Sequence, residues 1–181
     1  DMLLHLMTWQ EVGVYLKTST GIMMPIGSTE QHGPTGLIGT DAVCAEAIAK
    51  SAGEIAGAVV GPTIGVGMAQ HHMAFTGSMT LRPSTLVSVI ADYVNSLARH
   101  GFERFYFINA HGGNVSTVQS AFQEVYAQTS INGGGENRPR VRCVLRQWYQ
   151  RPRVLALAKK FYGNKEGYHA TPSEVAVTQY L

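Results

Sequence analysis

The chain has 181 residues, of which 45% are hydrophobic and only 14% are charged, and its net charge is +2 when the histidines are neutral. This length predicts a single domain with a buried core. The small net charge gives no reason to expect a nucleic acid or a membrane as a partner. Because soluble proteins usually contain about 25% charged residues, we expect part of the surface to be covered by another subunit.

Apolar segments alternate with helix-like segments along the chain, a pattern that predicts an α/β fold with a mainly parallel sheet. Strands are expected at residues 22–26, 58–61, 104–108 and 141–145. Helices are expected at residues 42–49, 84–100, 115–128 and 153–160, and from residue 172 onward.

Several residues mark the expected ends of these elements. Pro25 places the first strand at an edge of the sheet or at the strand's own end. Asp41 and Ser84 are expected to cap the helices that follow them, and Gly101 is expected to end a helix. A glycine-rich flexible loop is expected at residues 132–137.

The two cysteines, Cys44 and Cys143, lie in apolar segments and are expected to be buried free thiols. The first residues do not resemble a signal peptide, so we expect a cytoplasmic protein. The chain stops inside a predicted helix. We therefore expect residues 1–181 to be one domain that lacks its C-terminal part.

Polar side chains follow the first predicted strand in the segment Gly27-Ser-Thr-Glu30-Gln-His32-Gly33. If the backbone stays extended there, Glu30 and His32 point to the same side. Asp41 follows nine residues later, across a loop long enough to fold back on them. Catalytic groups gather at such carboxyl ends of strands in parallel α/β sheets.

His111 follows the strand expected at 104–108 and precedes Gly112 and Gly113, which allow a sharp turn. Two imidazoles and two carboxylates form a nitrogen and oxygen ligand set that suits Zn²⁺, Mn²⁺ or Fe²⁺. The sequence thus predicts one or two divalent metal ions bound by Glu30, His32, Asp41 and His111.

Each of these residues also has a simpler interpretation. Glu30 alone would be a surface carboxylate and His32 a loop residue. Asp41 could serve only as a helix cap, and His111 only as part of a turn. Their joint occurrence at strand ends favours the metal site.

Five motifs resemble those of the creatininase (creatinine amidohydrolase) family in order and spacing, over residues 22–181. They are Pro25-Ile-Gly-Ser-Thr-Glu-Gln-His-Gly-Pro34, Gly39-Thr-Asp41, His72-Met-Ala-Phe-Thr-Gly-Ser78, Ile108-Asn-Ala-His-Gly-Gly-Asn114 and His169-Ala-Thr-Pro-Ser-Glu174. The resemblance implies a three-layer α/β/α fold, a two-metal site bridged by Asp41, and a homohexamer.

Two departures separate this chain from the creatinine-cleaving members that it resembles. Those members carry a metal-binding glutamate where this chain has Gly113, so we expect Glu174 to serve as the further ligand, or the second metal to be weak or absent. The loop 164–169 has no tryptophan. Both departures move the expected substrate from creatinine towards another cyclic amide, a formamide or a small peptide-like substrate.

The resemblance also implies that His169 passes a proton to the leaving nitrogen, which suits an imidazole because its pKa is near neutral. Glu174 could instead simply favour the start of a helix. His72 is expected to line the substrate pocket, although it could be an ordinary polar loop residue. The amides of Gly112 and Gly113 are expected to stabilise an oxyanion.

The leading hypothesis is therefore a metal-dependent amidohydrolase that cleaves a C–N bond of a small amide with a water activated by the metal. One alternative is a non-catalytic homologue that keeps the fold and binds a metal or ligand. The other is a structural subunit whose low charge reflects oligomer contacts alone.

Overall fold

The computed structural model describes residues 2–131 and 140–181. The loop predicted at 132–137 lies outside the described residues. Four parallel strands form the central sheet in the order β2-β1-β3-β4. The strands are β1 (Gly21–Ile26), β2 (Val59–Val60), β3 (Arg104–Asn109) and β4 (Arg142–Gln147).

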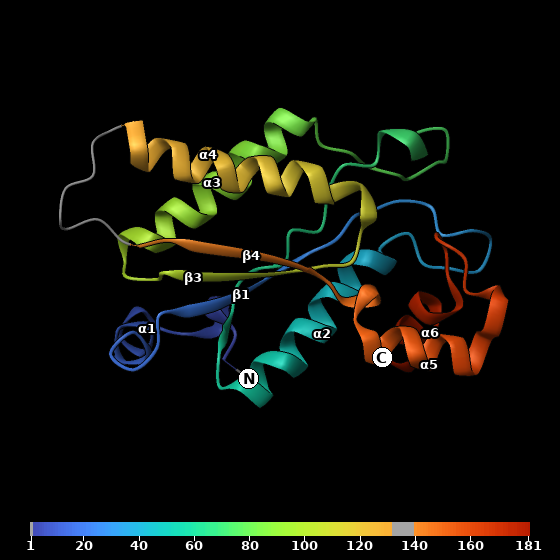
Figure 1. Ribbon diagram of the computed structural model, residues 1–181, viewed down its shortest axis with the longest axis horizontal. Coiled ribbons are helices and arrows are strands. Elements are labelled where there is room, and N and C mark those ends of the chain that lie inside the picture. Colours follow the sequence, from blue (N-terminus) through green and yellow to red (C-terminus); the bar gives the residue numbers. More distant parts are fainter. Residues whose placement is uncertain (1, 132–139) are drawn as a thin grey trace.

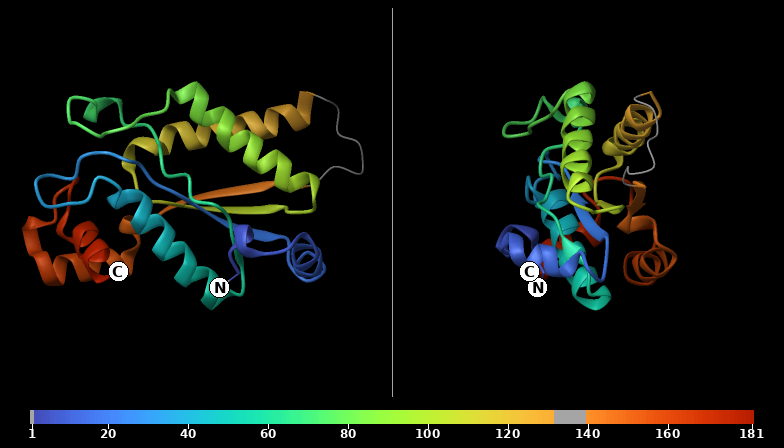
Figure 2. Two further views of the ribbon diagram at one scale, coloured as in Figure 1. Left: turned by 180° about the vertical axis from the view of Figure 1, so that it is seen from behind. Right: turned by 90° about the vertical axis from the view of Figure 1, so that its left-hand side faces the viewer.

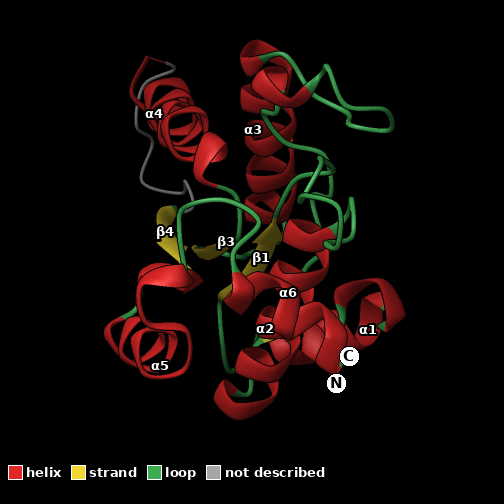
Figure 3. Cartoon of the chain, turned by 90° about the vertical axis from the view of Figure 1, so that its right-hand side faces the viewer, coloured by secondary structure: helices red, strands yellow, loops and turns green. Residues whose placement is uncertain are grey.

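Helices cover both faces of the sheet, as Figures 1 and 2 show from opposite sides. One face packs against α3 (Pro83–Arg99) and α4 (Val115–Ile131), and the other against α2 (Thr40–Ala56), with α5 (Pro152–Tyr162) and α6 (Pro172–Tyr180) beside it. Figure 3 shows the sheet end-on between these two layers. The predicted three-layer α/β/α fold is confirmed.

The apolar residues of the strands and helices separate into two buried clusters, one on each face of the sheet. On one face, Leu86, Ile90 and Val94 of α3 recur every four residues and pack towards Met24 and Phe107. On the other face, the small residues of α2 let the helix lie close to the sheet. Since α2 begins at the carboxyl edge of the sheet, this close packing brings its first turn next to the strand ends.

Two predicted helix starts differ from the structure. Gly39 and not Asp41 is the N-cap of α2, so Asp41 lies in the first turn and its side chain is free for other contacts. Arg82 and not Ser84 precedes α3, because Pro83 has its backbone already set for the first helical position. Pro25 lies near the end of β1, as one of the two predictions had it.

The other prediction for Pro25, an edge strand, is wrong because β1 pairs with both β2 and β3. Within a strand the N–H and C=O of one residue point to the same side, and the Pro25 carbonyl accepts from Ile64 N on the β2 side. The missing N–H therefore faces the place where β2 has already ended.

The sequence analysis missed α1 (Trp9–Tyr15), although Thr8 and Glu11 form a capping box that the sequence carries. Cys44 is buried as predicted, whereas Cys143 is only partly buried because β4 is at the edge of the sheet. Across residues 2–131 and 140–181, no helix is long and apolar enough to cross a bilayer.

Candidate metal centre

The loop after β1 brings Glu30, His32 and Asp41 together inside the protein. The loop folds back on itself because Glu30 N donates to Ile38 O at 2.8 Å. His32 Nε2 then lies 3.1 Å from Asp41 Oδ1 in the first turn of α2. Gly27 permits this approach, since a Cβ there would lie 2.4 Å from the backbone nitrogen of Ala42.

His111 joins these three residues from the end of β3. The side chain of Asn109 holds its backbone, donating to His111 O at 2.7 Å and accepting from His111 N at 3.1 Å. His111 Nδ1 lies 3.1 Å from Glu30 Oε1 and 3.2 Å from Asp41 Oδ2. The four residues predicted as ligands therefore meet, and they are almost fully buried, with exposed fractions of 0% for Glu30, 1% for His32, 2% for Asp41 and 5% for His111.

The backbone decides which nitrogen of each imidazole faces the carboxylates. His32 Nδ1 lies 3.0 Å from the carbonyl of Glu30, and His111 Nε2 lies 2.8 Å from the carbonyl of Met68. A carbonyl can only accept, so these two nitrogens carry protons. The other nitrogen of each ring, His32 Nε2 and His111 Nδ1, is left to bind a cation or a second proton.

Two buried carboxylate oxygens, Glu30 Oε1 and Asp41 Oδ2, accept no hydrogen bond, although His111 Nδ1 lies within 3.2 Å of both. Buried oxygens without partners are costly, and a bound cation would satisfy them. The residues present therefore fit a divalent metal ion, and the Asp41 carboxylate lies between His32 and His111.

The charge balance agrees with this fit. Burial alone would lower the pKa of His111, but the carboxylates of Asp41 and Glu30 outweigh it and raise that pKa to about 10. Asp41 likewise raises the pKa of His32 against the effect of burial. Burial alone would raise the pKa of Asp41, but the two imidazoles lower it. The two carboxylates thus bind positive charge strongly, as protons or as a metal ion.

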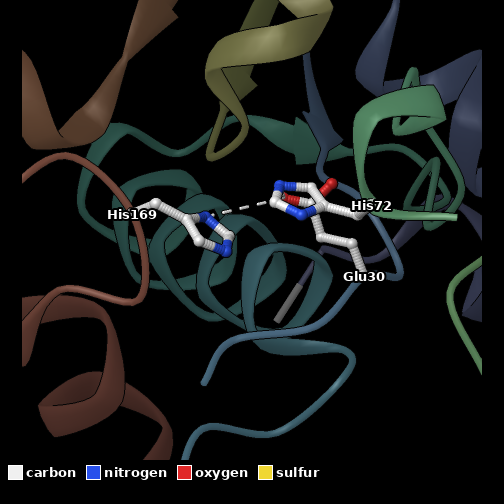
Figure 4. A group of neighbouring side chains, drawn as sticks. All are labelled: Glu30, His72 and His169. Carbon is white, nitrogen blue, oxygen red and sulfur yellow. Dashed lines mark ion pairs between the residues drawn. The ribbon is translucent and has the colours of Figure 1, made fainter. Parts of the chain in front are cut away.

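Figure 4 shows a second group of imidazoles on the outer side of Glu30. His72 Nε2 lies 3.5 Å and His169 Nδ1 lies 3.8 Å from Glu30 Oε1, and their rings stack with centroids 4.5 Å apart. Gln31 holds both rings: its side-chain nitrogen lies 3.0 Å from His72 Nδ1, and its carbonyl lies 2.8 Å from His169 Nε2. His72 and His169 therefore lie beside the predicted ligands, as a pocket and proton-transfer role requires.

Glu174 lies in the opening turn of α6, and the structure brings it near the site but not into it. Its Oε2 accepts from Thr171 N at 2.7 Å in a capping box. Burial first, and then Asp41, raise the pKa of Glu174. Three groups of described residues place potential ligand atoms within 4.8 Å of one another, and Glu174 is in none of them.

The paired glycines differ in their surroundings. A Cβ at Gly113 would lie 2.4 Å from His111 Nε2 and 2.7 Å from Met68 O, whereas one at Gly112 would meet only the Tyr149 hydroxyl at 3.6 Å. The hydrogen bond between His111 and Met68 therefore occupies the space that a side chain at position 113 would need. Gly112 instead faces a cavity of about 230 Å³ that is also lined by Tyr149, His169 and Glu174.

Sequence reasoning missed the residues that hold the ligands in place, chiefly Gln31, Met68, Asn109 and Asn114. Gln31, Asn109 and Asn114 lie inside the motifs, so their polar type at a strand end was an available signal. Met68 acts through its backbone carbonyl, for which its side chain gives no signal.

The fold and this donor set define an α/β protein with a site suited to divalent metals at the carboxyl edge of a parallel sheet. The chain belongs to the creatininase family, whose model, described as "Creatinine amidohydrolase", matches residues 5–181. The resemblance noted from the motifs is thereby confirmed.

Individual relatives agree with the family. The chain is 34% identical over 106 residues to the mycofactocin precursor peptide peptidase of Mycolicibacterium smegmatis, which covers 55% of this chain and 42% of that protein. It is 30% identical over 129 residues to the creatinine amidohydrolase of Pseudomonas putida, covering 66% and 50%. The chain spans about half the length of the curated relatives that it matches.

The fold also matches solved structures. One described as "Creatininase Mn" superposes with a TM-score of 0.80 at 23% identity, covering 93% of this chain and 65% of the other. At this identity the likeness concerns the fold.

Proposed function

We propose that the protein is a metal-dependent amidohydrolase that hydrolyses the C–N bond of a small amide, either a cyclic amide or a formamide. The observation that carries the proposal is the pair of buried carboxylate oxygens, Glu30 Oε1 and Asp41 Oδ2, which accept no hydrogen bond and converge on His111 Nδ1. Membership of the creatininase family and the hydrolase names of the relatives support it.

Glu30, His32, Asp41 and His111 would hold one or two divalent ions, with Asp41 shared between them. Zinc, manganese and iron all suit this ligand set, and structures of similar fold are described as "Creatininase Mn" and as a creatininase of "Zn-Zn type". Glu174 is proposed as a further ligand through Oε1, since Oε2 caps its own helix. A bound metal would supply Lewis-acid activation of water and of the amide carbonyl.

The remaining steps fall to side chains around the cavity. His169 would carry the transferable proton on Nδ1, with its Nε2 donating to the Gln31 carbonyl 2.8 Å away. His72, whose ring stacks on that of His169 beside Glu30, would orient the substrate. The backbone amides of Gly112 and Gly113, at the start of the short helix before α4, would stabilise the oxyanion of the tetrahedral intermediate.

The proposal includes a homo-oligomer, a hexamer by family resemblance, in the cytoplasm. The low charged fraction supports an oligomer, as do the exposed apolar side chains Leu155, Leu157 and Phe161 on α5.

The test is elemental analysis of the purified protein, followed by chelation and metal add-back in assays on cyclic amides, formamides and short peptides. We expect stoichiometric metal, loss of turnover on chelation and recovery on add-back. His111→Ala should lose turnover while the circular dichroism spectrum is kept. Metal-free protein with full activity would contradict the proposal.

A second candidate is a non-catalytic homologue that keeps the fold and binds a metal or ligand. Gly113 favours it, because this position cannot supply the glutamate ligand of the creatinine-cleaving members. Bound metal without hydrolysis of any amide in the panel would support this candidate, and chelator-sensitive hydrolysis would exclude it.

A further inference from the structure

The side chain of Asn114 is fully buried and joins three separate segments of the site. Its Nδ2 donates to Gly27 O after β1 at 2.8 Å, and to Asn109 Oδ1 at the end of β3 at 3.2 Å. Its Oδ1 accepts from Met68 N, in the loop after β2, at 2.9 Å. Both hydrogens of the amide and its oxygen are therefore used, each on a different segment.

Two of these contacts lead to His111. Met68, held at its N–H by Asn114, accepts from His111 Nε2 with its carbonyl at 2.8 Å. Asn109, held at Oδ1 by Asn114, binds both the N–H and the carbonyl of His111. Asn114 thus fixes the imidazole through Met68 and the backbone through Asn109.

The glycine at position 67 is required by the same contacts. A Cβ there would lie 2.2 Å from Asn114 Oδ1 and 2.6 Å from Gly27 O. Two residues earlier, a Cβ on Gly65 would have its nearest neighbour at 3.8 Å, an ordinary van der Waals contact. The backbone at position 67 is therefore packed directly against the Asn114 side chain, whereas position 65 has room for a Cβ.

We propose that Asn114 is a positioning residue, which sets the His111 ring so that Nδ1 faces Glu30 and Asp41. The inference rests on the proposed metal centre, although Asn114 itself would not contact the metal. Residues that support a ligand in this way typically change metal affinity by about 10- to 100-fold. A residue important only for folding would change stability and leave the affinity of the folded protein unaltered.

The experiment measures zinc affinity by competition with a chromogenic chelator, in protein shown by circular dichroism to be folded. We expect Asn114→Ala to bind zinc about 10- to 100-fold more weakly than the wild type. The matched control is Asn95→Ala, which removes an exposed asparagine on α3 whose side chain donates to Gln128, and its affinity should stay within about twofold. Gly67→Ala should show the same loss as Asn114→Ala, and Gly65→Ala should not.

A second measurement follows the His111 Nε2 proton and the Met68 amide by NMR exchange with water. Both should exchange slowly in the wild type and in Asn95→Ala, and at least about tenfold faster in Asn114→Ala or Gly67→Ala. Folded variants with wild-type affinity and slow exchange would overturn the inference. If neither variant folds, a rapidly exchanging Met68 amide in the wild type would overturn it.

Failure of the proposed metal-dependent function can be distinguished from failure of the inference about Asn114. If the wild type binds no zinc, manganese or iron, the proposed function fails. The exchange measurements on metal-free protein still decide whether Asn114 holds Met68 and His111.

Discussion

Two regions of the molecule face the same carboxylate, Glu30, and differ in how firmly they are built. At the strand ends the side chains of His32, Asp41 and His111 are buried, and both imidazoles are fixed by backbone carbonyls. The segment 163–171 approaches from outside: the His169 side chain is 34% exposed, and Ala170 has a left-handed backbone with φ of 50°.

This difference indicates that the two regions have different roles. The buried side chains are held by hydrogen bonds to the backbone and to Asn109, so the protein itself sets their orientation. The outer segment lines the cavity with exposed residues, and exposed loops tolerate change more readily than buried ones. We therefore expect metal binding to depend on the buried side chains, including the proposed ligand Glu174 at the start of α6, and turnover and substrate choice to depend on the outer segment as well.

The largest effect is expected from removing Asp41, which touches both imidazoles. Asp41→Ala should lose turnover to background and weaken metal binding by at least about 100-fold, since a ligand matters no less than its supporting residues. Asp92→Ala, an exposed carboxylate on α3, is the matched control. Retained stoichiometric metal in Asp41→Ala would remove Asp41 from the ligand set.

His169→Ala should lower kcat by about 10²- to 10⁴-fold, the usual contribution of a general acid or base, and leave the metal content unchanged. His100→Ala, an exposed histidine after α3, controls for loss of any imidazole. Metal lost together with kcat would instead show that His169 is a ligand, as its grouping with Glu30 and His72 permits. Elemental analysis beside steady-state kinetics separates the two outcomes.

The sequence also predicts the two regions to different extents. The strands and the four buried donors follow from apolar runs and from polar residues at their carboxyl ends, which are local signals. The carbonyl of Met68 is 43 residues from His111 in the chain, and only the tertiary fold brings the two together. The choice of nitrogen on each imidazole could not be predicted for that reason.

Local signals also compete with one another. Asp41 carries a strong capping signal, yet Gly39 caps α2, because the buried imidazoles use the Asp41 carboxylate. The capping box of α1 is a local signal carried by Thr8 and Glu11, so the start of α1 is predictable from the sequence. The left-handed conformation of Ala170 has no signal in the residue type, since alanine rarely adopts it.

The pH dependence of the metal-free protein tests the buried region. The folded pKa of His111 is raised to about 10 from an unfolded value of about 6.5, so its stabilising effect is complete below about pH 6.5 and is lost as the pH rises through 10. The unfolding free energy of chelator-treated protein should therefore fall by a few kcal/mol at most over this range. Urea titrations at pH 6, 8 and 10 measure it.

Two comparisons sharpen this pH test. Saturating metal should remove the loss, because the metal replaces the proton on Nδ1 and binds better as the pH rises. His111→Gln should show a smaller loss than the wild type. A wild-type stability that stays flat between pH 6 and 10 would contradict the charge balance described for the site.

Substitutions at Gly112 and Gly113 are expected to have a smaller effect, on the stability of the protein. Gly113→Ala forces a Cβ against His111 Nε2 and Met68 O, and such overpacking typically costs about 1–3 kcal/mol. Gly112→Ala, its matched control, faces the cavity and should change stability by less than about 0.5 kcal/mol. Equal stability of the two variants, measured by thermal unfolding, would contradict the tight packing at position 113.

The smallest effect is expected in the outer segment, at Ala170. A left-handed backbone costs a residue with a Cβ about 1–2 kcal/mol, and glycine avoids that cost but loses about 0.5–1 kcal/mol through the freedom of the unfolded chain. Ala170→Gly should therefore stabilise the protein by no more than about 1 kcal/mol, with Ala127→Gly, inside α4, destabilising it by about the same amount. Ala170 lies between His169 and Thr171, the N-cap of α6. The metal content of the Ala170→Gly variant should therefore be unchanged, and only its kcat should change. If Ala170→Gly lost its metal, the outer segment would be part of the metal-holding structure, and the division between the two regions would be wrong.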